Sequence, residues 1–165
     1  MKRILVLAGL FVMLLTSAAF AARSSMPRSA MYIGGVGSGC TVGYVKSIYG
    51  EPADEDWFEG EGVRVVTLLY SDAFKVMART SLRNPVDEDE MIVCGFTCTD
   101  PSFKTPFGVG VGMPFSKVSD KFGPGGKTTN HRGEVFHYYS AGAVETDFYI
   151  DNNGIIRKIY QGTEL

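Results

Sequence analysis

Cys40 is the side chain in this sequence with the clearest potential for chemistry. It follows a glycine-rich run and stands at the start of a predicted helix. Backbone N–H groups and the helix dipole at such a place lower the pKa of a thiol and favour the nucleophilic thiolate. His137, on a predicted strand, is the type of side chain that takes the proton from such a nucleophile. The pair indicates one enzymatic possibility, hydrolysis by a cysteine.

The stretch that must position Cys40 occurs twice. Residues 35–50 return as residues 108–123, with six identical positions, four glycines and two valines. Each copy leads from glycines into a short amphipathic helix that ends on glycine. Met113 stands in the second copy where Cys40 stands in the first. The same surroundings therefore occur without the thiol, which favours a structural role for Cys40, buried or in a disulfide.

The internal similarity continues beyond the two helices, which we predict at residues 42–49 and 115–122. A polar loop follows each helix, at 51–61 and at 124–133. Residues rich in β-branched and aromatic side chains then predict strands at 66–71, 73–80 and 91–97 in the first copy, and at 135–140, 144–150 and 155–160 in the second. We therefore predict an α+β fold of two tandem repeats, each a short helix plus a three-stranded antiparallel sheet. The repeats, residues 31–100 and 101–165, share a core as one compact domain.

The beginning of the chain has the pattern of a secretory signal. Lys2 and Arg3 precede an apolar run at 4–15, and Ala19-Phe20-Ala21 has the small-x-small cleavage pattern. We expect residues 1–21 to be a cleaved signal peptide, the alternative being an uncleaved anchor, and residues 22–30 to be a disordered leader. The protein is then exported, periplasmic or extracellular, with no stable membrane anchor after cleavage.

Charge and motif spacing argue against several classes of ligand. The 16 basic and 18 acidic residues include no basic stripe for nucleic acid. The glycine runs lack the Gly-Lys-Ser or Gly-Lys-Thr of a phosphate loop and the spacing of a dinucleotide site. His131 and His137 are six residues apart, wider than a usual zinc cluster. We expect no cofactor and no metal.

Three cysteines in an exported chain allow one disulfide and leave one thiol. Cys94 and Cys98 are four apart in a predicted strand, where their Cα atoms would be roughly 13 Å apart. They can pair only if the chain turns near Thr97. Otherwise Cys40 pairs with one of them, which is the pairing that we prefer.

Two resemblances bear on the fold and the chemistry. The pattern Gly-x5-Val-x3-Tyr/Phe-Gly with a following proline (Pro52, Pro124), a strand pair, a hairpin at Asn153-Gly154 and a final Ile-Ile-x-x-Ile resembles the SmpA/OmlA (BamE-like) repeat. The tandem arrangement is similar to the β-lactamase inhibitor protein fold, which implies that two such units form one saddle-shaped sheet. The surroundings of Cys40 also resemble the nucleophile helix of NlpC/P60 cysteine peptidases, but the histidine strand of that family is missing.

Aromatic side chains mark the candidate binding surface. Trp57 and Phe58 lie in the acidic loop at 51–61, where they contact a partner or where Trp57 folds back over the sheet edge. A second group is expected on the sheet face opposite the helices: Tyr138, Tyr149, Tyr160 and Lys158. We predict a non-enzymatic protein-binding module of the cell envelope whose partner is another envelope or extracellular protein. The alternative is an exported cysteine hydrolase of NlpC/P60 type that uses Cys40 and His137.

Overall fold

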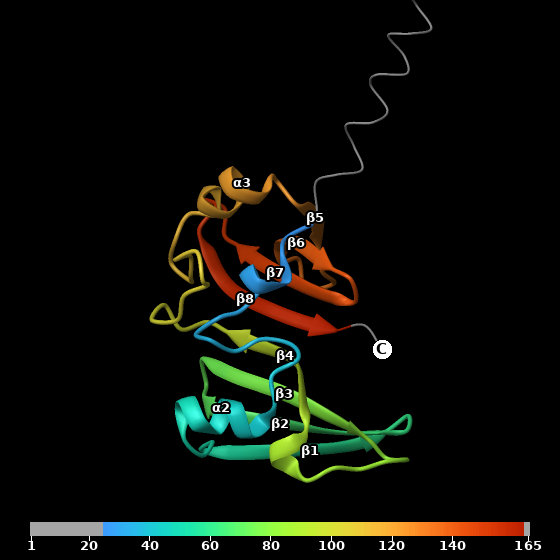
Figure 1. Ribbon diagram of the computed structural model, residues 1–165. Coiled ribbons are helices and arrows are strands. Elements are labelled where there is room, and N and C mark those ends of the chain that lie inside the picture. The colour runs from blue at the N-terminus through green and yellow to red at the C-terminus, as the bar shows by residue number, and fades with distance from the viewer. Residues whose placement is uncertain (1–24, 164–165) are drawn as a thin grey trace, which may run out of the picture.

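The computed structural model describes residues 25–163, and the expected signal peptide, residues 1–21, lies outside this range. Its main feature is one antiparallel sheet of eight strands, in the order β1-β2-β3-β4-β8-β7-β6-β5 (Figure 1). In chain order the strands are β1 (Asp54–Gly60), β2 (Val63–Ser71), β3 (Phe74–Ser81), β4 (Ile92–Cys98), β5 (Gly126–Thr129), β6 (Val135–Ala141), β7 (Val144–Ile150) and β8 (Ile156–Thr163). The helices are α2 (Val42–Tyr49) and α3 (Ser116–Phe122), with two 3-10 turns, η1 (Arg28–Ala30) and η2 (Glu88–Glu90).

The predicted fold class is wrong. We expected two tandem repeats of a helix plus a three-stranded sheet, whereas the described chain forms a single eight-stranded sheet with only two short helices and is mostly β. The two strands that we did not predict, β1 and β5, are the edges of this sheet and lie where we expected loops. Edge strands carry charged and small residues without a buried face, so their sequences lack the alternation that marks a central strand.

The other elements lie where their sequence patterns placed them. Both helices and the six inner strands agree with the predicted ranges to within a few residues. The glycine-rich stretches have one role in the two halves of the molecule, residues 31–100 and 101–163: each pairs with the start of its half's last strand. The Cys40 carbonyl accepts a hydrogen bond from Val93 N–H at 2.8 Å, and the Met113 carbonyl accepts one from Ile156 N–H at 2.9 Å.

The core lies between the sheet and the two helices, which cover the same face. Alternate strand residues on this face are buried, and the register joins Val76, Phe96, Gln161 and Thr146 in one row from β3 to β7. Val42 and Val45 of α2 and Val118 of α3 are buried above this face. One cluster of rings packs in each half, around Phe74 in the first (Tyr49, Tyr70, Phe103) and around Phe148 in the second (Phe115, Tyr139).

The two halves meet where β4 pairs with β8 over Gly95–Cys98 and Ile159–Gly162. A Cβ atom at Gly95 would collide with the carbonyl oxygen of Gln161, so the strands can approach only with glycine here. The buried Gln161 side chain accepts a hydrogen bond from Ser38 N–H at 2.6 Å and donates to the Met31 carbonyl at 2.7 Å and the Thr146 hydroxyl at 3.2 Å. Residues 25–30, the described part of the expected leader, include the turn η1 and the buried Met26.

Candidate functional site

The sheet surface opposite the helices, which we call the open face, is the candidate functional site. Its side chains alternate with those of the core. One row of paired residues crosses it from edge to edge: Asp54, Leu69, Lys75, Thr97, Tyr160, Asp147, Tyr138 and Gly126. Among the described residues no helix packs on this face. Its side chains are half-buried or exposed, Asp147 excepted.

The second half places a group of aromatic rings on the open face. Tyr149 stacks on Phe136, with ring centroids 4.8 Å apart. Lys158 Nζ lies 3.6 Å from the centroid of the Tyr149 ring and 3.1 Å from Glu134 Oε1. A cation over an aromatic face is attracted by the ring quadrupole, so this group is ordered before any partner arrives. The structure thus brings four of the predicted site residues to one face: Tyr138, Tyr149, Lys158 and Tyr160.

The other two predicted site residues are separated from this group and from each other. Trp57 and Phe58 lie in edge strand β1, not in a loop, and point to opposite faces because successive strand residues alternate. Trp57 is on the helix-covered side, 48% exposed, and its indole N–H donates to Glu55 at 3.1 Å. Phe58, opposite Val65, is on the open face and 63% exposed. Only Phe58 therefore belongs to the surface that carries the tyrosines.

A buried carboxyl group lies near the centre of the open face. Asp147 is 5% exposed, flanked across the sheet by Tyr138 and Tyr160. Its Oδ1 atom has no hydrogen-bond partner among the described residues. Burial raises the pKa of Asp147 to about 7, and the nearby charge and hydrogen bond of Glu145 act in the same direction. Lys158 opposes this shift only in part, because its ammonium group also bonds Glu134.

Two hollows on the open face adjoin the seam between β4 and β8. One, of about 180 Å³, is lined by Glu145, Tyr160, Gly162 and Thr163. The other, of about 230 Å³, shares the last three of these residues and continues over apolar side chains of the first half, among them Phe58, Val65 and Met77. Gly162 faces Glu145 on one side and Gly95 on the other. The hollows exist because this glycine pair leaves the sheet bare.

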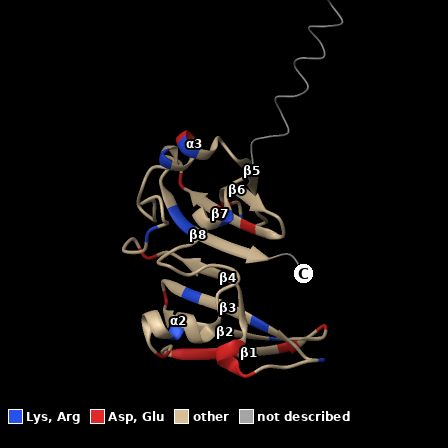
Figure 2. Ribbon diagram, in the orientation of Figure 1, with Lys and Arg blue, Asp and Glu red and all other residues tan. Residues whose placement is uncertain are grey.

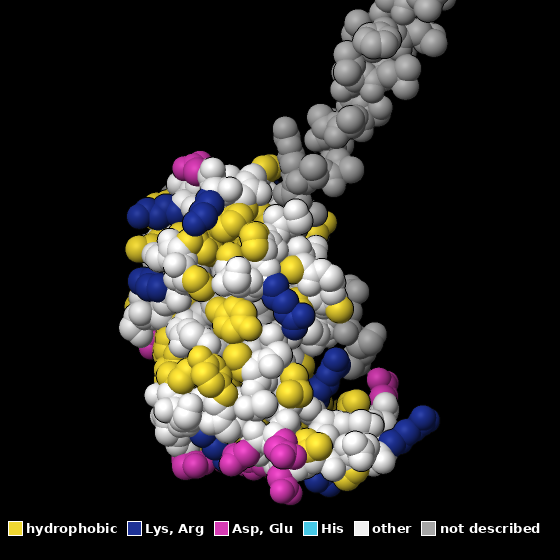
Figure 3. Space-filling view, in the orientation of Figure 1, with side chains coloured by type: hydrophobic (Ala, Val, Ile, Leu, Met, Phe, Trp, Pro, Cys, Tyr) yellow, Lys and Arg dark blue, Asp and Glu magenta, His cyan; other side chains and the backbone are white. Residues whose placement is uncertain are grey.

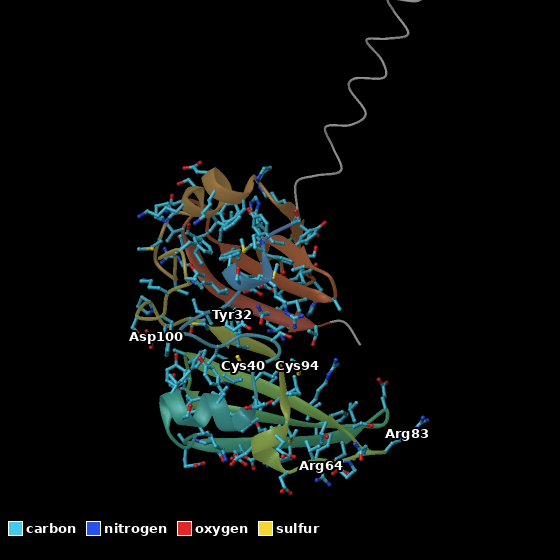
Figure 4. The ribbon with its side chains drawn as sticks, in the orientation of Figure 1. Tyr32, Cys40, Arg64, Arg83, Cys94 and Asp100 are labelled. Carbon is cyan, nitrogen blue, oxygen red and sulfur yellow. The ribbon has the colours of Figure 1, made fainter. Side chains whose placement is uncertain are left out.

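The predicted disulfide does not form, since Cys40, Cys94 and Cys98 are all free thiols. Cys94 and Cys98 lie in the same strand and the chain does not turn back at Thr97. Cys40 and Cys94 lie near the junction of the halves (Figure 4). Their side chains go different ways: Cys40 packs against the core, whereas Cys94 lines the larger hollow of the open face. Burial raises the pKa of the Cys94 thiol and raises that of Cys98 to about 11.

The two residues of the alternative enzymatic site are in different halves. His137 stacks on Phe115, with ring centroids 4.1 Å apart, and its Nδ1 lies 2.8 Å from the Pro124 carbonyl oxygen. Burial lowers its pKa. Cys40 is hydrogen-bonded through its backbone to β4. Strands β8 and β7 separate β4 from β6, a distance of about 14 Å at the usual strand spacing.

Two functional or structural residues were not singled out by sequence reasoning. The alternation in β7 does place Glu145, Asp147 and Tyr149 on one face, but nothing local to that strand indicates that Asp147 is buried. Its burial comes from tyrosines of β6 and β8. Gln161 is the only glutamine in the chain and sits in an otherwise apolar strand, a signal that could have marked it.

The described residues offer little to a metal or a membrane. Within residues 25–163, no three His, Cys, Asp or Glu side chains are grouped so that they could hold a metal ion. In the same range, no helix combines the length and the apolar character needed to cross a bilayer.

Comparison with known proteins gives similarity at the level of structure only. No family model matches the chain, and no curated protein matches it. A cysteine-rich secretory protein from Staphylococcus aureus subsp. aureus Mu50 is similar with a TM-score of 0.55 and 10% identity, over 86% of this chain and 48% of that one. An extracellular protein containing an SCP domain from Bacillus anthracis str. Ames has a TM-score of 0.49 and 12% identity, over 76% and 44% of the two chains. The chain spans about half the length of these proteins.

A protein from Streptococcus mutans, provisionally described as a beta-lactamase inhibitor protein, has a TM-score of 0.31 and 14% identity over 90% of this chain and 96% of that one. Such a protein among the neighbours is consistent with the expected resemblance, but the similarity is too weak to establish a shared fold. No BamE-like repeat is shown by these comparisons. The similar structures are secreted or extracellular proteins, and at this level of identity they show the fold alone.

Proposed function

We propose that this protein is an exported, non-enzymatic module that binds another envelope or extracellular protein on its open face. The observation that carries the proposal is that all eight strands form one sheet with helices on one side only. The open face combines a stacked aromatic pair, a cation held over one ring and half-buried apolar side chains. Tyrosine and other aromatic side chains of this kind are enriched in the energetic centres of protein interfaces.

The charges of the open face support a protein partner over a small molecule. The two central strands of the halves carry opposite charges: Lys75 and Arg79 on β3, Glu145 and Asp147 on β7. Figure 2 shows the basic positions of β3 and the acidic β1 edge beside them. A partner that fits must present charges of both signs across the distance between these strands. Such an arrangement fixes the orientation of docking more than it adds affinity.

The positions of Cys40 and His137 support the proposal over a cysteine hydrolase. A nucleophile and its base must come within hydrogen-bond reach. Here the imidazole is stacked on Phe115 and bonded to Pro124, three strands away from the segment that holds Cys40. Met113 has the same backbone pairing as Cys40, which supports a structural role for both positions.

The experiment that tests the proposal is site-specific photo-crosslinking in cells. A benzophenone side chain replaces Tyr149 on the open face or, as the matched control, Lys117 on the exposed surface of α3. We expect a discrete crosslinked partner from position 149 and none from position 117. Tyr149→Ala combined with Tyr160→Ala should weaken recovery of that same partner while the fold persists by circular dichroism, and Cys40→Ser should leave it unchanged.

Two outcomes would contradict the proposal. Equal crosslinking from positions 149 and 117 would mean that the open face has no special role. Hydrolysis of peptidoglycan peptides that Cys40→Ser or His137→Ala abolishes would replace the binding function by an enzymatic one.

A further inference from the structure

The Asp147 carboxyl group has no structural reason to be buried. Buried carboxyl groups in proteins are paired or fully hydrogen-bonded, since an unsatisfied one costs free energy. Asp147 is 5% exposed, yet its Oδ1 has no partner among the described residues. Glu145, which lies two residues away on the same face, adds a second carboxyl group and so raises the cost. A polar atom kept in this state at the centre of a binding face indicates a partner that arrives from outside.

The surroundings of these carboxyl groups suit an organic cation. Tyr160 lies directly across β8 from Asp147 and Tyr138 lies across β6. Cations are attracted to the faces of such rings, and a planar guanidinium group can stack on a ring while it donates to a carboxylate. The nearest cation of the chain, Lys158, is over the Tyr149 ring and bonded to Glu134. A metal ion is a poorer fit, because no third ligand of the usual types joins the two carboxyl groups within residues 25–163.

The two hollows define what lies beside the cation. The smaller hollow has Glu145 in its wall, and the larger one joins it at Tyr160, Gly162 and Thr163. The larger hollow is lined mainly by apolar side chains, including Phe58, Val65 and Met77. A segment of extended chain that crosses Gly162 can therefore place a cationic side chain in one hollow and an apolar one in the next.

We infer that the hollow beside Glu145 and Asp147 receives an arginine side chain of the protein partner, with an adjacent apolar side chain of the same partner in the hollow over Met77. This inference rests on the proposed function, whose partner it describes. The guanidinium group donates to Asp147 Oδ1 and to the Glu145 carboxylate and packs against Tyr160. The Asp147–Glu145 pair then releases its shared proton, so binding strengthens as the pH rises.

The groups that face Asp147 determine this pH response. They are Glu145 and Tyr149 on its own strand, Lys158 and Tyr160 on β8, and Tyr138 on β6. The tyrosines stay neutral and Lys158 stays charged through the neutral range, so the carboxyl pair is the part of this group that titrates there.

A titration followed by NMR tests the site without the natural partner. The probes are three capped dipeptides, leucine followed by arginine, by lysine or by citrulline, the neutral analogue of arginine. We expect the arginine peptide to shift the amide signals of Glu145, Asp147, Tyr160 and Gly162 and to bind about tenfold more tightly than the citrulline peptide. Asp147→Asn and Glu145→Gln should each remove most of this difference. Asp56→Asn, which removes a carboxylate from the same face at the β1 edge, should leave it unchanged.

The outcomes separate this inference from the proposed function. Equal binding of arginine and citrulline peptides, shifts confined to other residues, or no shifts at millimolar peptide would overturn it. Equal binding of the lysine peptide would overturn the assignment to arginine. If Asp147→Asn leaves the photo-crosslinked partner at full yield, the cation site is wrong while the binding function stands. If position 149 gives no crosslink at all, the binding function is wrong, and the peptide titration still reports on the hollow.

Discussion

The two halves of the molecule follow the same order of elements, a helix and then four strands, but differ in side chains at matching places. Met77 stands at the centre of β3 on the open face, between Lys75 and Arg79, whereas Asp147 stands at the centre of β7 between Glu145 and Tyr149. The helix-covered face is apolar in both halves. The comparison teaches that the covered face is under the same packing requirement in both halves, while the open face has diverged and carries the specific chemistry.

The edges differ as well. β1 is a seven-residue strand that carries four acidic side chains, and β5 has only four residues. Beside β1, Lys46 of α2 pairs with Glu51, Glu88 and Asp89, and these bonds raise its pKa, chiefly through Glu88. Figure 3 views the helix-covered face and shows acidic side chains gathered at this lower end and basic ones toward α3. Charge keeps the long β1 edge from pairing with other chains, and shortness does the same for β5.

The largest effect should come from removing the ring at the centre of either aromatic cluster. Phe74→Ala and Phe148→Ala should each lower the free energy of unfolding by about 4 kcal/mol, because each leaves a cavity in the core. Both variants should unfold in one transition in urea, seen alike by circular dichroism and by the fluorescence of Trp57, the only tryptophan. A Trp57 transition separate from the loss of circular dichroism would mean that the halves are independent units.

Gln161→Leu should cost about 3 kcal/mol, because it leaves the Ser38 N–H, the Met31 carbonyl and the Thr146 hydroxyl buried without this partner. The measurement is urea denaturation. Asn84→Ala, which removes an exposed amide, serves as the control and should change stability by less than about 0.5 kcal/mol. A loss as small as the control's would show that Gln161 does not join the halves.

The acidic centre of the second half should make stability depend on pH. The pKa of Asp147 is about 7 in the folded protein, above its ordinary value of 3.8, so the protonated form is the one that the fold favours. Its contribution is complete below the ordinary pKa and is lost as the pH rises toward 7. Asp147→Asn should therefore gain stability over the parent between pH 4 and pH 8, on the order of 2 kcal/mol. The control Asp56→Asn should show no such gain, and a parallel pH profile for Asp147→Asn would contradict the burial of this acid.

The smallest effect distinguishes the two helices. Thr41 Oγ1 accepts a hydrogen bond from Tyr44 N–H at 3.2 Å at the start of α2, whereas α3 begins after Phe115 without a side-chain cap. Thr41→Ala should therefore cost about 1 kcal/mol in urea denaturation. Ser116→Ala at the first residue of α3 should be neutral, and an equal loss from both changes would remove this distinction.

Sequence reasoning reached as far as local periodicity does. The alternation Val144, Thr146, Phe148, Ile150 defined β7 and its two faces, and the glycine-to-glycine pattern defined α2. It did not find β1, because the alternation there is Asp, Asp, Phe on one face and Glu, Trp, Glu on the other, neither of them buried. It placed the tyrosines on one face but not Trp57, since the strand that carries Trp57 was taken for a loop.

What remained hidden depends on residues that are distant along the chain. The burial of Asp147 comes from three strands, and the free state of the thiols comes from the sides of β4 to which Cys40 and Cys94 turn. Their positions in sequence carry no record of these arrangements. The hollow over Gly162 likewise needs its glycine partner in β4, 67 residues earlier.

The hydrogen bonds of Gln161 also have a consequence for how the chain folds. Residues 25–38 contact the second half first: Ser25 bridges to Ser140, and Met31 and Ser38 bond Gln161 across 130 and 123 positions of sequence. Contacts of such separation close large loops before they contribute stability, which makes folding slow. Because β8 is the final strand to be synthesised, the start of the chain has nothing to bind until translation is nearly finished. The nascent protein must therefore remain incomplete in its first half until its last strand has joined the sheet.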